Sequence, residues 1–160
     1  MLLKAKDSYR LDEEGGIFVV IVLDTSHCPI CQSVLSMRAT RQRVWWKGEE
    51  DKEILLIRRL YCDKCERIHH ELPDCLVPYK RYGADIIENI ANGQAAEDAP
   101  CPEGAVRRLR EWWAAVKLYF LHILLTLTEK FGVSFGSPPA FRETVRAVAN
   151  SKRIPCLRLS

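Results

Sequence analysis

Two kinds of hydrophobic pattern divide the chain near residue 78. Before it, short runs rich in β-branched and aromatic residues occupy positions 17–23, 37–46 and 53–61, with polar or glycine-containing segments between them. After it, apolar residues recur every three or four positions, which is the spacing of an amphipathic helix. We therefore expect an α+β protein with a β-rich domain at residues 1–78 and a helical domain at residues 79–160.

In the first part, the runs at 37–46 and 53–61 are separated by a polar segment, which predicts a β-hairpin. The run at 17–23 predicts a strand that leads toward Cys28. Residues 67–78 contain Pro73 and Pro78, which disfavour a regular helix and predict an extended connector between the two parts.

In the second part, the pattern predicts three helices. The first covers residues 82–92 and ends at Gly93, and the last covers residues 139–150. Between them, a long helix begins at Pro102 and ends before Gly132. Its apolar stripe predicts either core packing or a dimer interface, and it consists of Val106, Leu109, Trp113, Val116, Phe120, Ile123 and Leu127.

Four of the seven cysteines form two Cys-x-x-Cys pairs, Cys28 with Cys31 and Cys62 with Cys65. The pairs are separated by thirty residues, enough for the predicted hairpin. Zinc prefers four tetrahedral ligands, and two such turns supply four thiolates. The spacing therefore predicts a β zinc ribbon with one structural Zn²⁺ ion, whose filled shell leaves no position for a substrate.

Other interpretations of these side chains stay open. The thiols could be buried without a metal, or one pair could be a redox dithiol. Four neighbours could replace a ligand or bind a second ion: His27, His69, His70 and Cys75. The run at 69–71 could supply a general base or a DNA contact, but we favour a polar connector that caps the ribbon. Cys75, Cys101 and Cys156 have no assigned role beyond packing.

The formal net charge is only +3, so the position of the basic residues matters more than their total. The predicted hairpin and the residues after it contain a basic group, together with Trp45 and Trp46, that is suited to phosphate and base contacts. In the hairpin and at its borders this group consists of Arg38, Arg41, Arg43, Lys47, Arg58, Arg59, Lys64 and Arg67, and a second basic group, Lys80 and Arg81, precedes the first helix. The alternative is a solvated sheet face whose charges are balanced by the acidic residues at the hairpin tip.

Three further arginines, Arg107, Arg108 and Arg110, lie in the first turns of the long helix, where cations do not complement the helix dipole. Placing them there suggests an anionic partner such as a DNA phosphate. The first two helices therefore predict a helix-turn-helix-like hairpin whose second helix enters the major groove, although the connection is longer than the usual three or four residues. The alternative is a plain helical hairpin.

The run at 57–82, together with residues 85–88 and 107–113, resembles a family of bacterial zinc-ribbon proteins. That family is similar to the amino-terminal part of insertion-sequence transposases, in which a zinc ribbon precedes a helix-turn-helix that binds the ends of the element. The resemblance covers residues 28–131. It implies that the four paired cysteines are the metal ligands and that the helix opening at 103–110 takes the recognition position.

These observations favour a zinc-stabilised DNA-binding protein, an accessory or regulatory factor of a mobile genetic element. The alternative is a zinc-ribbon protein-interaction module, an adaptor or a homodimer formed through the long helix, with Trp112, Trp113, Tyr119 and Phe120 offered to a partner. No catalytic motif points to an enzyme or to a small-molecule substrate. Neither apolar stretch is long enough to span a membrane, and the first sixteen residues have no signal-peptide core, so we expect a cytoplasmic protein.

Overall fold

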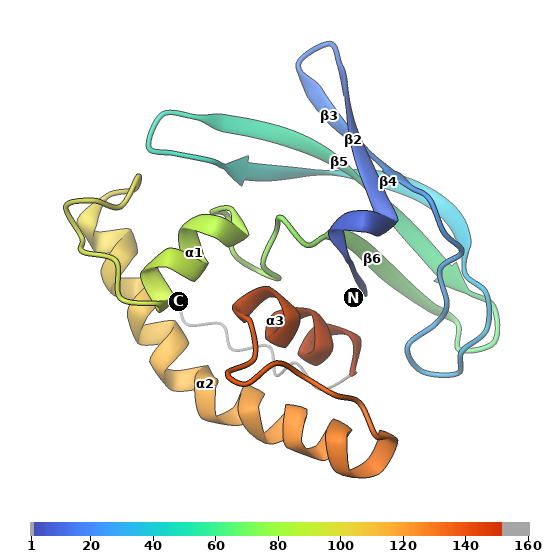
Figure 1. The fold of residues 1–160 in the computed structure, drawn as a ribbon. Coiled ribbons are helices and arrows are strands. Elements are labelled where there is room, and N and C mark those ends of the chain that lie inside the picture. The colour runs from blue at the N-terminus through green and yellow to red at the C-terminus, as the bar shows by residue number, and fades with distance from the viewer. Residues whose placement is uncertain (1, 152–160) are drawn as a thin grey trace.

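The computed structural model describes residues 2–151, which form a mixed α+β fold with one six-stranded sheet and three α-helices (Figure 1). The strands are β1 (Leu2–Lys4), β2 (Tyr9–Glu14), β3 (Ile17–Val22), β4 (Ser36–Trp46), β5 (Lys52–Cys62) and β6 (Arg67–Pro73). The helices are α1 (Ala84–Ala91), α2 (Glu103–Phe131) and α3 (Phe141–Asn150), and a single 3₁₀ turn, η1 (Lys6–Ser8), lies between β1 and β2. The α+β class is confirmed, and each of the six elements predicted between residues 17 and 150 is present to within two residues at either end.

Strand β5 is the centre of the sheet. Strand β4 pairs with it antiparallel from Ser36 opposite Tyr61 to Trp46 opposite Lys52, so the predicted hairpin is correct. Along its other edge, β5 pairs antiparallel with β6 and, nearer its start, parallel with β3. β2 continues the sheet beyond β3, and β1 continues it beyond β6.

The first sixteen residues contain two strands that the pattern did not predict. Strand β2 forms a hairpin with β3 around Gly15 and Gly16, whose φ angles of 57° and 78° suit the two-residue turns that match strand twist. Strand β1 is only three residues long and pairs parallel with β6. Strand β1 is too short to show a pattern, and four of the six residues of β2 are charged, so both strands depend on neighbouring strands for their stability.

The predicted connector at 67–78 is wrong in its first half, because residues 67–73 are strand β6. The second cysteine pair forms the turn that joins β5 to β6, and the register from Cys62 opposite Arg67 to Arg58 opposite Glu71 follows from it. Pro73 is the last residue of the strand, where it does not interrupt the pairing with β5. The prolines therefore end this strand and do not prevent it.

The helices cover one face of the sheet (Figure 1). Leu55 and Ile57 of β5, which are at most 1% exposed, pack in the same cluster as Ile87 of α1, Val116 of α2 and Val148 of α3. The hydrophobic core is thus continuous across residue 78. The domain boundary predicted there stays a prediction.

The apolar stripe of α2 packs into this core. Trp112 and Phe120 are buried, and Trp113 contacts Phe141 of α3 with 5.1 Å between the ring centroids. These aromatic side chains, together with the half-buried Tyr119, are therefore largely unavailable to a partner. None of the helices within residues 2–151 is long and apolar enough to cross a membrane.

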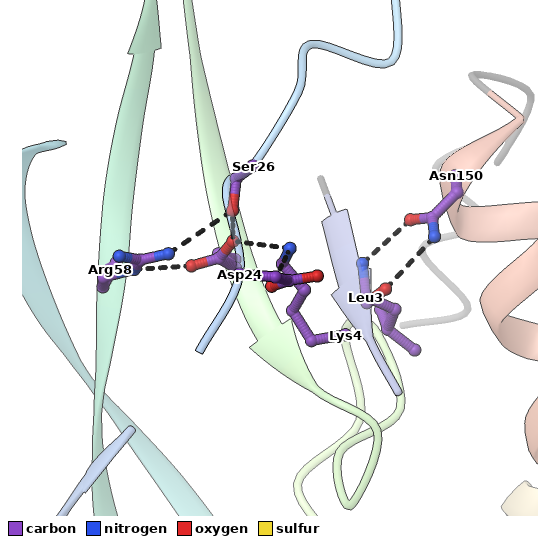
Figure 2. A network of polar contacts seen from close by, with 7 residues as sticks. Leu3, Lys4, Asp24, Ser26, Arg58 and Asn150 are labelled. Atoms are coloured by element: carbon purple, nitrogen blue, oxygen red, sulfur yellow. Dashed lines mark hydrogen bonds and ion pairs between the residues drawn. The ribbon is translucent and has the colours of Figure 1, made fainter. Parts of the chain in front are cut away.

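A polar network lies on the opposite face of β5 and β6 (Figure 2). The Glu71 carboxylate, 1% exposed, accepts hydrogen bonds from the Ser26 hydroxyl and from Arg58 Nε, the latter at 2.6 Å. Lys4 Nζ lies 3.7 Å from the same carboxylate and 2.8 Å from Asp24. The network ties β1, β5, β6 and the segment before Cys28 together.

Figure 2 also shows how the end of α3 is attached to β1. The Asn150 carboxamide accepts a hydrogen bond from the Leu3 backbone N–H at 2.9 Å and donates one to the Leu3 carbonyl at 3.1 Å. Because a side chain takes the place of a neighbouring strand here, the outer edge of the short β1 is protected.

Candidate metal centre and basic surface

The four paired cysteines converge at one end of the sheet. Cys28 and Cys31 lie in the loop between β3 and β4, whereas Cys62 is the last residue of β5 and Cys65 lies in the turn that leads to β6. Their sulfur atoms are all within 4.8 Å of one another, and Cys28 and Cys62 are fully buried. The pairing of β4 with β5, which begins with Ser36 opposite Tyr61, thus brings together two pairs that are thirty residues apart in sequence.

The spacing of the sulfurs fits one tetrahedral metal ion. A Zn–S bond of about 2.3 Å implies an S–S edge of about 3.8 Å in a regular tetrahedron. The observed distances are 3.9 Å between Cys28 and Cys65 and 3.5 Å between Cys31 and Cys62. A disulfide would need about 2.05 Å. The four thiols are therefore arranged so that they could bind one tetrahedral metal ion.

The two cysteine turns share an unusual backbone conformation. The residue directly after the second cysteine has a positive φ in both, 61° at Gln32 and 52° at Glu66. In the first turn, the backbone N–H of Ile30 lies 3.4 Å from Cys28 Sγ, and the N–H of Gln32 bonds to the Cys28 carbonyl. Left-handed conformations cost energy in residues other than glycine, so the recurrence of this one indicates that metal-ligand geometry determines both turns.

Protonation of the four thiols is uneven. Hydrogen bonds from the Ser33 side chain and backbone lower the pKa of the Cys31 thiol to about 6. Hydrogen bonding to Cys31, followed by burial, raises the pKa of Cys65 to about 12. Burial also raises the pKa of Cys62. The Cys31 thiolate forms readily here, whereas the thiolates of Cys62 and Cys65 require a cation to compensate their charge.

The neighbours that could have replaced a ligand occupy other positions. His69 Nε2 lies 3.6 Å from Cys28 Sγ, so it contacts a ligand atom from outside the shell. Cys75 contacts Tyr9, and His27 is exposed. Within residues 2–151, the four cysteines are the one group of three or more His, Cys, Asp or Glu side chains close enough to hold a metal. Cys101 is buried in the core, and Cys156 lies outside the described residues.

The model of a domain of unknown function, DUF6431, matches residues 28–109. The chain belongs to the DUF6431 family. The matched segment begins at the first metal-site cysteine and contains all four, together with β4, β5, β6, α1 and the start of α2. Comparison with curated proteins and with solved structures finds no match. The DUF6431 match thus supports a shared domain that spans the metal site and the first helices, and the likeness to transposases stays a prediction.

Four of the arginines predicted to contact DNA share one face of β4 and β5. Arg41 stands opposite Ile57, Arg43 opposite Leu55 and Arg59 opposite Ala39. These positions continue the helix-covered face of the sheet toward the metal site. Arg38, at the register shift in β4, places its guanidinium 4.4 Å from the centre of the Tyr61 ring on the same face.

This face also contains His70, which stands opposite Arg59 in β6. Burial, followed by the charges of Arg41 and Arg59, lowers the pKa of the His70 imidazole. Burial, followed by the charges of Arg41 and Arg81, lowers the pKa of Arg43. The basic surface, defined as Arg38, Arg41, Arg43, Arg59 and His70, is thus a group of arginines that repel one another around a histidine that is neutral at pH 7.

The basic surface has no acidic partner within residues 2–151. None of its arginines is within 4 Å of a carboxylate. The Nε atoms of Arg43 and Arg59 are buried and have no hydrogen-bond acceptor. Because an unpaired buried donor is costly, the protein alone leaves these two guanidinium groups incompletely satisfied.

Arg58 is separated from this group although it is next to Arg59 in the chain. Successive residues of a strand point to opposite faces, and Arg58 therefore joins the Glu71 network on the other side of the sheet. The other predicted contacts lie nearby. Arg43 donates a 2.9 Å hydrogen bond to the Lys80 carbonyl, which places Lys80 and Arg81 beside the basic surface.

The helix arginines are exposed at the start of α2. Arg107 and Arg108 are without ion-pair partners in the described part of the chain, and Arg110 donates a hydrogen bond to the Gln94 carbonyl. The sequence analysis did not identify Ser33, which hydrogen-bonds to the metal-site thiol of Cys31. Its position two residues after Cys31 was the one sign of this role. The sequence analysis also missed Tyr79, which follows Pro78 and precedes two cations in an otherwise featureless connector.

Proposed function

We propose that this chain is a zinc-stabilised DNA-binding protein, an accessory or regulatory factor of a mobile genetic element. The basic surface carries the proposal, because its arginines have no carboxylate partner and two of them bury an unpaired Nε atom. A row of phosphates supplies the missing negative charge and accepts hydrogen bonds from exposed guanidinium groups such as those of Arg38 and Arg41. The tie to mobile elements rests on the resemblance to the amino-terminal part of insertion-sequence transposases.

In this proposal zinc is structural. Four thiolates complete its shell, so no position is open for water or substrate, and we assign the protein no catalytic role. The bound ion holds the turn between β5 and β6, and these strands carry Arg59 and His70. The metal thereby maintains the position of the basic surface that contacts DNA, while the ion itself stays remote from the DNA.

The helices extend the contact. Arg81 lies near Arg43 of the basic surface and lines a groove together with the exposed Arg108 at the start of α2. We assign α1 and α2 to a helix-turn-helix-like hairpin with α2 in the recognition position, as the resemblance implies. Support comes from the exposure of these arginines at the amino-terminal end of a helix, where only an anion would favour them.

The test is a titration of the zinc-loaded protein with a random-sequence duplex at several salt concentrations. Each phosphate contact contributes about −0.9 to the slope of log Kobs against log salt, so we expect a slope of about −3 or steeper. Arg59→Gln should weaken binding and reduce the slope by about one.

Arg58→Gln is the matched control, because Arg58 is adjacent in sequence but lies on the opposite face. It should leave both the affinity and the slope unchanged as long as the variant is folded. Absence of binding at low salt, or equal losses in the two variants, would contradict the proposal.

A second candidate is a homodimer formed through α2. Leu118 and Leu125 are 77% and 62% exposed, and their spacing of seven residues places them on one stripe of the helix. Two such stripes from two copies could pair. A monomeric mass at micromolar concentration would exclude this candidate, whereas a dimer that Leu118→Glu dissociates would support it.

A further inference from the structure

A groove of about 650 Å³ separates the turn before α1 from the first half of α2. The groove is lined by aromatic rings and by charged side chains. The rings are Tyr79 and Trp112, and the charged residues are Lys80, Arg81, Arg108 and Glu111. Volumes of this order accommodate a ligand the size of a nucleotide. The groove is next to the basic surface, because Lys80 accepts the hydrogen bond from Arg43.

The backbone at Tyr79 is strained. Residues 77–80 form a β-turn closed by a 3.1 Å hydrogen bond from the Lys80 N–H to the Val77 carbonyl. Pro78 occupies the second position, and Tyr79 in the third has a φ of 64°. A turn with that sign of φ favours glycine or asparagine at this position, and a bulky aromatic residue is disfavoured.

Packing does not compensate this strain. Tyr79 is 57% exposed and stands at the edge of the groove, so its ring is presented to solvent. Tyr79 keeps a costly backbone conformation without being buried, which indicates that it serves a function and does not stabilise the fold. An exposed ring beside phosphate-binding side chains is the arrangement that proteins use to stack an unpaired base.

The walls of the groove fit the rest of a nucleotide. Lys80 Nζ lies 4.4 Å from the centre of the Trp112 ring, which holds its half-buried ammonium at the side of the groove. Arg81 and Arg108 are exposed at its edges, where guanidinium groups can reach phosphates on either side of a stacked base. Glu111 is the acidic side chain in this lining, and it can accept hydrogen bonds from the exocyclic amino group of a base.

We propose that Tyr79 is a stacking platform for an unpaired base of single-stranded DNA, with Arg81 and Arg108 binding the adjacent phosphates. The inference rests on the proposed DNA binding and specifies its substrate as DNA with unpaired bases. The basic surface binds the backbone of either form, whereas the groove accepts only a base that has left the double helix.

The experiment compares three labelled probes of the same length by fluorescence anisotropy at one salt concentration. They are a thymidine 12-mer, a 12-mer of abasic sites with the same phosphates, and a 12-base-pair duplex. The zinc-loaded protein should bind the thymidine strand at least about fivefold more tightly than the abasic strand, because stacking of one base contributes that much. Equal affinity for these two strands would overturn the inference.

Variants at Tyr79 separate stacking from structure. Tyr79→Gly should reduce the preference for the thymidine strand to near onefold while raising the Tm by about 2 °C or more, since the strain is relieved. Tyr79→Phe should keep the preference. Phe131→Ala, which removes another exposed ring at the far end of α2, is the control and should change nothing. An unchanged preference in Tyr79→Gly, or a lower Tm with reduced binding of all probes, would overturn the inference.

The two proposals fail in different ways. If no probe binds at low salt, the proposed DNA binding is wrong and the inference falls with it. If all three probes bind equally and Tyr79→Gly binds as the wild type does, DNA binding stands and only the stacking role is wrong.

Discussion

His69 Nε2 lies 3.6 Å from the sulfur of Cys28, and both side chains are buried. Burial, to which the charge of Arg67 adds, lowers the pKa of His69, so the imidazole is neutral at pH 7. A neutral ring with its proton on Nε2 donates a hydrogen bond to the thiolate. His69 is therefore positioned to orient a ligand without being one, a relationship that increases metal affinity in other thiolate and imidazole sites.

We expect His69→Phe, which keeps the ring volume and removes the donor, to weaken zinc binding by about 10- to 100-fold. Competition with a zinc chelator at pH 7.5 measures the change. His27→Phe is the control, because His27 is next to Cys28 in sequence but exposed. Unchanged affinity in His69→Phe would show that the 3.6 Å contact is packing alone.

Removing one ligand should unfold the metal-bearing end of the sheet. We expect Cys62→Ser to lose stoichiometric zinc, because metal binding contributes on the order of 10 kcal/mol to folding in such sites. Metal content by elemental analysis and the Tm are the measurements. Cys75→Ser, at a partly buried cysteine outside the cluster, should keep one zinc ion per chain. A variant at Cys62 with full metal content would contradict the site assignment.

Zinc affinity should depend steeply on pH. Binding displaces the thiol protons, and the raised pKa of Cys62 and of Cys65, the latter about 12, means that both are protonated in the metal-free protein at neutral pH. The pKa of Cys31 is lowered to about 6, so its thiol adds to the proton competition only below that pH. Chelator competition between pH 8 and pH 5 should therefore show a slope that steepens by about one proton below pH 6. In Ser33→Ala this change of slope should move to higher pH.

Breaking the Glu71 network should destabilise the fold. Arg58→Gln leaves a carboxylate that is 1% exposed without its main cation, and Lys4 compensates only in part. We expect a loss of about 2–3 kcal/mol in the free energy of unfolding, below the value for a fully buried pair because the Arg58 side chain is 24% exposed. Chemical denaturation of the zinc-loaded protein measures it. Replacing both partners, Arg58→Met with Glu71→Leu, should recover most of the loss.

Much of the fold could be predicted from local pattern. The three helices and the β4–β5 hairpin follow from apolar periodicity. The spacing of the four cysteines predicts correctly that they lie together. Strands β1, β2 and β6 could not be predicted in this way, because their stability comes from neighbours distant in sequence. Strand β6 is the clearest case: its prolines suggest a connector, yet pairing with β5 makes it a strand.

Which arginines act together was also beyond the sequence. Arg58 and Arg59 look equivalent in the sequence. Because successive strand residues point to opposite faces, Arg58 pairs with Glu71 on one face, whereas Arg59 lies beside His70 on the other. The register of β4 against β5 then decides which cations of β4 join Arg59. Such grouping depends on pairing between strands, and a single residue of slip would exchange the two faces.

The turn that holds Cys62 and Cys65 is also the connection between the strands that carry Arg59 and His70. We therefore expect the protein to lose its proposed DNA binding when it loses the metal ion, although the ion does not contact the DNA. In a cell short of zinc, newly made chains would remain inactive and vulnerable to proteolysis at this end of the sheet. The concentration of a trace nutrient would then limit how many active copies the cell holds, independently of how strongly the gene is expressed.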